Sequence, residues 1–67
     1  MEDIEKRFTY HAPKGDQPQR YQVIREIAKG FAQFINDRCP DSREKSLALT
    51  KLEEAVMWAN ASIARNE

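Results

Sequence analysis

The sequence predicts an all-α fold: an antiparallel helical hairpin with a short N-terminal arm, completed by homo-oligomerisation. Two long segments repeat apolar residues at three- and four-residue spacing, the period of an amphipathic helix. The link between them contains the run CPD and is short enough to force an antiparallel return. The chain has 67 residues, and domains of that size are only marginally stable without a staple.

We expect one domain, residues 1–67, with the arm at 1–16 and long helices at 17–38 and 42–65. Pro13 and Gly15 enforce a loop in the arm. Asp16 is the predicted N-cap of the first long helix, with Gln19 placed to complete a capping box. The apolar residues at helical spacing in this helix are Ile24, Ile27, Ala28, Phe31, Phe34 and Ile35.

Gly30 lies inside the first long helix, where glycine costs about 1 kcal/mol relative to alanine. It marks a close helix crossing, a bend or an ordinary tolerated glycine.

The second long helix is apolar on more than one side. Asp41 and Glu44 form its predicted capping box. One apolar stripe consists of Ala48, Leu52, Ala55, Val56, Ala59 and Ile63. Outside that stripe lie Leu47, Leu49, Met57 and Trp58. Such a helix needs more than one partner, so we expect it to pack against the first helix and against a second chain.

Composition excludes several classes of protein. One cysteine cannot form an internal disulfide, and one cysteine with one histidine cannot complete a structural zinc site. The formal net charge of zero removes a general attraction to long nucleic acids and anionic membranes. No apolar run approaches the ~18 residues that span a bilayer, and the polar start is not a secretory signal. We expect a soluble, intracellular protein without a metal or cofactor.

The sequence offers no catalytic constellation. The single histidine, His11, has no neighbouring nucleophile and orienting group, and Cys39 has no histidine near it in sequence. Glu53 and Glu54 project about 100° apart on a helix rather than converging. We therefore predict no catalytic residues and a protein that is not an enzyme.

Cations and aromatic rings gather in the run RFTYHAPKGDQPQRY. Residues 6–29 carry six cations against two acids, an excess of four positive charges that suits a compact anion. Aromatic rings stack on nucleobases, while Lys and Arg neutralise phosphates. The candidate ligand-binding residues are Tyr10, His11 and Lys14 in the loop and Arg20, with Tyr21 beside it, in the first helical turn. Two plainer interpretations stay open: the cations are scattered and solvated, and Phe8, Tyr10 and Tyr21 pin the arm to the hairpin.

The run FTYHAPKGDQPQRY and, after the first helix, the block CPDSREKSLALTKLEEAVMWANASIARNE resemble the phage-encoded anti-CBASS cyclic-oligonucleotide sponges. These share a helical-hairpin domain with the anti-Thoeris sponges. The resemblance extends from about Arg7 to Glu67. It implies a non-enzymatic protein that sequesters cyclic dinucleotides, such as cGAMP, and cyclic trinucleotides in the cytoplasm of the infected bacterial host. It also implies a compact homo-oligomer, typically a hexamer, with pockets between protomers.

The resemblance also implies roles for individual residues. Tyr10 matches an arm tyrosine that stacks on a base, and Lys14 is the best match for a lysine that meets the phosphate. Arg20 or Arg25 are the alternatives for that lysine role. Arg65 is the candidate for a second, trinucleotide pocket.

Two rival functions follow from other features. A helical adaptor would dock a host protein through Trp58 and Met57, with the arm as a clasp. A small nucleic-acid binder is disfavoured by the neutral net charge and by the acidic residues of the second long helix.

Overall fold

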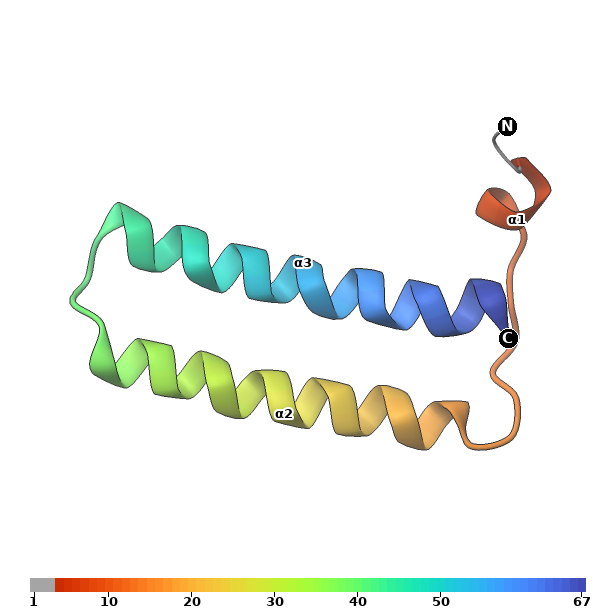
Figure 1. The fold of residues 1–67 in the computed structure, drawn as a ribbon, viewed down its shortest axis with the longest axis horizontal. Coiled ribbons are helices and arrows are strands. Elements are labelled where there is room, and N and C mark those ends of the chain that lie inside the picture. Colours follow the sequence, from red (N-terminus) through yellow and green to blue (C-terminus); the bar gives the residue numbers. More distant parts are fainter. Residues whose placement is uncertain (1–3) are drawn as a thin grey trace.

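The protein is an all-helical hairpin with an N-terminal arm, as shown by a computed structural model that describes residues 4–67. The described helices are α1 (Ile4–Phe8), α2 (Gln17–Arg38) and α3 (Arg43–Asn66). Helices α2 and α3 lie side by side and run in opposite directions, and the arm passes the open end of the hairpin (Figure 1). The all-α hairpin expected from the sequence is confirmed. The first three residues of the arm lie outside the described residues.

The capping box expected at the start of α2 does not form. Asp16 occupies the N-cap position, but its side chain accepts no capping hydrogen bond. Instead, the main-chain amide of Lys14 donates to Gln17 Oε1 at 3.0 Å, and the main-chain amide of Gln17 donates to the Lys14 carbonyl at 2.9 Å. Gly15, with φ of +52°, supplies the left-handed residue that this turn requires. Asp16 is thus the N-cap residue as expected, but the expected capping box is wrong, because a reciprocal contact between Lys14 and Gln17 closes the turn instead.

The cap of α3 lies one residue later than expected. Ser42, rather than Asp41, is the N-cap, and its Oγ accepts a hydrogen bond from the main-chain amide of Lys45 at 3.1 Å. Asp41 instead accepts a hydrogen bond from Lys45 Nζ at 2.9 Å, and that ammonium also donates to the carbonyl of Asn36 at 2.9 Å. Lys45 therefore ties the end of α2 to the start of α3 across the link.

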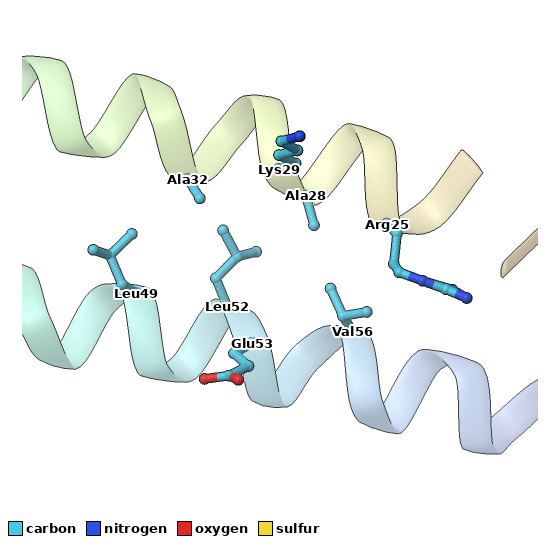
Figure 2. A pocket seen from close by; sticks show the side chains of 8 residues that line it. All are labelled: Arg25, Ala28, Lys29, Ala32, Leu49, Leu52, Glu53 and Val56. Carbon is cyan, nitrogen blue, oxygen red and sulfur yellow. The ribbon is translucent and has the colours of Figure 1, made fainter. Parts of the chain in front are cut away.

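The two long helices approach each other through small residues on α2 and branched residues on α3. Figure 2 shows Leu49, Leu52 and Val56 pointing toward Ala28 and Ala32. On the other side of this seam the lining residues are Ile24, Ile27, Ala28, Phe31, Leu52, Ala55, Val56 and Ala59. The inter-helix contact is thus apolar and is open to solvent along both sides.

The described chain has no buried apolar core. Its smallest dimension is 14 Å, little more than the ~10–12 Å diameter of one helix with its side chains. No hydrophobic side chain among residues 4–67 is buried, and the one buried residue is Gln17. The large apolar residues left exposed are Ile4, Phe8, Tyr10, Val23, Ile27, Phe31, Phe34, Leu47, Met57 and Trp58. A single layer of two helices cannot cover the apolar faces that the sequence carries.

Gly30 is not explained by a close contact within the chain. Helix α2 continues through it, and a Cβ placed there would meet no atom within 4 Å. Of the three interpretations of this glycine, a close crossing with α3 is excluded.

Replacing Gly30 with alanine should therefore stabilise the hairpin. We expect Gly30→Ala to raise the free energy of unfolding by about 0.5–1 kcal/mol, because alanine restricts the unfolded chain and fits the open space. Urea unfolding followed by circular dichroism measures this change. Gly15→Ala is the matched control and should destabilise, because its φ of +52° is strained for alanine. A lower urea midpoint for Gly30→Ala would instead indicate that another surface packs closely on this position.

Candidate ligand-binding site

Three side chains from the arm and the start of α2 converge on Glu67, the residue that caps α3. We name Lys14, Gln17, Arg20 and Glu67 the Glu67 cluster. Arg20 forms two contacts with the carboxylate: Nη1 donates to Oε2 at 3.0 Å, and Nη2 pairs with Oε1. Gln17 Nε2 donates to Oε1 at 3.4 Å, and Lys14 Nζ donates to the main-chain oxygen of Glu67 at 2.7 Å. The cluster thus presents a guanidinium, an amide and an ammonium to one residue.

The antiparallel hairpin creates this cluster. The start of α2 and the end of α3 lie at the same open end of the molecule, and the arm reaches α2 there (Figure 1). Arg20 and Glu67 are therefore neighbours although they are 47 residues apart in sequence. Gln17 is only 3% exposed, because its amide bridges the arm and Glu67. Burial of an uncharged amide with partners on both sides stabilises this junction without burying a charge.

The charges of the cluster are nearly balanced. Asp16 Oδ2 lies 3.3 Å from Arg20 Nε, so Arg20 lies between two carboxylates. The hydrogen bonds from Arg20 and Gln17 lower the pKa of the Glu67 carboxyl below its ordinary value, and the hydrogen bond to Glu67 raises the pKa of Arg20. The side chains of Arg20 and Glu67 are 39% and 45% exposed. Ion pairs this exposed are weak and are screened by salt.

Tyr10 and His11 lie on the extended arm between α1 and α2. Tyr10 is 82% exposed, so its ring is not packed against the hairpin. His11 is half-buried. Phe8 is 81% exposed, and the interpretation that Phe8 and Tyr10 pin the arm is wrong for the described chain. Tyr21, by contrast, is half-buried.

Arg25 and Arg65 lie outside the Glu67 cluster. Arg25 lines the groove between α2 and α3 together with Lys29 and Glu53 (Figure 2). Arg65 is half-buried in the last turn of α3. Of the six candidate ligand-binding residues, the structure brings Lys14 and Arg20 together in one cluster.

Sequence reasoning missed Gln17 and Glu67. Gln17 resembles any polar residue in the first turn of a helix, and no local pattern marks a glutamate after a helix as a partner for the arm. The antiparallel return does place the end of α3 beside the start of α2. A search for opposite charges at that end would have found the pair of Arg20 and Glu67.

Metal binding and membrane insertion find no structural support within residues 4–67. These residues hold no group of three or more His, Cys, Asp or Glu side chains arranged to ligate a metal ion. None of the described helices combines the length and the apolar composition required to span a bilayer.

The contact between the start of α2 and the end of α3 should depend on pH through Glu67. Because the folded-state pKa of Glu67 is depressed, the contribution of its carboxylate to this contact is fully present above the ordinary carboxyl pKa of 4.5 and is lost as pH falls through the lower folded value. Carboxyl carbon NMR titration should therefore show Glu67 titrating below 4.5. We expect Arg20→Ala to return this pKa toward 4.5, and Arg43→Ala, at the far end of the hairpin, to leave it unchanged. An ordinary Glu67 pKa in both the wild type and Arg20→Ala would contradict this electrostatic assignment.

Comparison with known proteins adds an independent finding. No curated protein and no solved structure matches the chain. The family model described as "Acb2/Tad1, hairpin domain" matches residues 1–64, nearly the full length. This match covers the arm, helix α2 and helix α3 as far as residue 64. The chain belongs to the Acb2/Tad1 hairpin-domain family, the anti-CBASS and anti-Thoeris sponges.

Proposed function

We propose that this protein is a phage anti-defence sponge that binds cyclic di- and trinucleotide signals of CBASS and sequesters them without cleavage. The family implies the coarser function, a sponge for cyclic nucleotides. The site of action is the cytoplasm of the infected bacterial host, where such signals are made.

The observation that carries this proposal is the meeting of Lys14 and Arg20 at the base of the arm that bears Tyr10. A phosphodiester needs cationic donors, and a nucleobase needs a flat aromatic surface. Tyr10 is exposed and unpacked, so its ring is free to stack on a base. Lys14 and Arg20 supply the charge for the phosphates.

The proposed binding unit is a homo-oligomer, a hexamer in this family's pattern, with pockets between protomers. Its support is the single-layer hairpin, which leaves Met57 and Trp58 more than half exposed on α3. Two equivalent arms related by a two-fold axis would each cover one half of a pseudo-symmetric cyclic dinucleotide.

A cyclic trinucleotide would occupy a second pocket between protomers, with Arg65 as the proposed contact. The support for this assignment is that Arg65 is half-buried in the last turn of α3 and is not among the residues that form the Glu67 cluster. Arg25, in the groove between the long helices, remains the reserve candidate for phosphate contact.

One observation favours a second candidate function. Met57 and Trp58 are 53% and 57% exposed, and aromatic and methionine side chains are enriched where proteins dock. A helical adaptor would use this surface to bind a host protein. A tryptophan buried between copies of the chain would remove the feature on which the adaptor depends.

Tyr10→Ala should greatly weaken cyclic dinucleotide binding. Loss of one base–aromatic stack costs about 1–3 kcal/mol, a decrease in affinity of about 5- to 150-fold. Isothermal titration calorimetry with cGAMP measures this change, and size-exclusion chromatography checks that assembly is retained. Phe8→Ala is the matched control, since Phe8 is an equally exposed aromatic residue of the N-terminal region.

The bound ligand should be recovered intact. Mass spectrometry of cGAMP released by heat after the titration should show the cyclic form alone. A linear dinucleotide would instead identify a phosphodiesterase, and unchanged affinity of Tyr10→Ala would refute the assigned role of Tyr10.

A further inference from the structure

The cations that the proposed function assigns to ligand phosphate are already occupied. Arg20 and Lys14 both bind Glu67, and Arg20 also lies beside Asp16. A ligand phosphate therefore meets a site that holds an anion of the chain itself.

We propose that Glu67 is an internal competitor for the ligand: its carboxylate takes the place of a ligand phosphate on Arg20, its main-chain oxygen takes that place on Lys14, and phosphate binding displaces both. The identity of the ligand in this proposal rests on the proposed function. The competition between Glu67 and a phosphate rests only on the contacts of the Glu67 cluster.

The donors of the cluster suit a phosphate as well as a carboxylate. The two-atom contact between Arg20 and the Glu67 carboxylate has the same fork geometry that guanidinium groups use for phosphate oxygens. Lys14 Nζ and Gln17 Nε2 add an ammonium and an amide donor directed at the same residue. Glu67 thus occupies the point on which three donor groups converge.

Charge balance makes displacement necessary. Counting side chains alone, Lys14 and Arg20 carry two positive charges, and Glu67 and the neighbouring Asp16 carry two negative charges, so the side-chain charges sum to zero. A phosphate that joined the cluster with Glu67 in place would lie against a carboxylate and gain no net attraction. When Glu67 leaves, the remaining charge is positive and favours the incoming anion.

Displacement is physically easy at this position. The Arg20–Glu67 pair is exposed to solvent, and such pairs are weak. Helix α3 ends at Asn66, so the side chain of Glu67 can move away without unwinding a helical turn. In the ligand-free protein, the same pair holds the start of α2 against the end of α3.

Glu67→Gln tests the competition with the least structural change. The variant keeps the side-chain length but removes the charge that opposes phosphate. We expect cGAMP to bind the variant about two- to fivefold more tightly than the wild type in low salt, the range that an exposed ion pair supplies. Glu44→Gln, the same substitution in the first turn of α3 at the far end of the hairpin, is the control and should leave affinity unchanged.

A second probe keeps this test separate from the proposed function. Binding of inorganic pyrophosphate, followed by nitrogen NMR of the Arg20 guanidinium, should also be tighter in Glu67→Gln. If wild-type protein fails to bind cGAMP but the variant gains affinity for pyrophosphate, the proposed function fails and the competition stands. Equal or weaker binding of pyrophosphate by Glu67→Gln overturns the competition, as does equal or weaker cGAMP binding when the wild type binds cGAMP.

Discussion

The structure depends on one constraint: two amphipathic helices in a single layer cannot bury their own apolar faces. Small residues such as Ala28 and Ala32 let α2 and α3 approach, but the seam between them is open on both sides. Large side chains such as Phe31 and Trp58 remain more than half exposed. Apolar area exposed on this scale is a cost that association removes. In the proposed oligomer, contacts between chains bury the apolar side chains that a single hairpin leaves exposed.

The charged contacts of the Glu67 cluster lie at the open end of the hairpin. The arm joins α2 beside the end of α3, and the Glu67 cluster ties these segments together with exposed, salt-sensitive contacts and one buried amide, Gln17. A junction of this kind holds the arm in place. Its exposed ion pairs are weak, so an anion that binds the cations more tightly than Glu67 can displace them. The proposed sponge therefore needs no catalytic group. It needs the cations Lys14 and Arg20, an aromatic ring on the arm and a neighbouring chain that closes the pocket.

The hairpin was predictable because helical periodicity and a short proline-containing link act locally in the sequence. The helix caps were less predictable. The side chain of Asp16 pairs with Arg20 and does not cap α2, and Ser42 is the N-cap of α3 where Asp41 was expected. The contact between Arg20 and Glu67 joins residues 47 apart, so no local pattern reports it. Lys14 and Arg20 were identified as cations of the site, but their intramolecular partner was not. The ligand roles of all six candidate residues stay predictions, because they depend on a ligand and on neighbouring chains: Tyr10, His11, Lys14, Arg20, Arg25 and Arg65.

Sedimentation velocity of the ligand-free protein tests whether the hairpin must associate to stay folded, because a chain without a buried apolar core should not stay folded alone. At micromolar concentration we predict one discrete species several times heavier than the 7.8 kDa chain, with dilution causing dissociation and loss of helical circular dichroism together. A monomer that keeps full helicity and unfolds cooperatively under these conditions would contradict the claim.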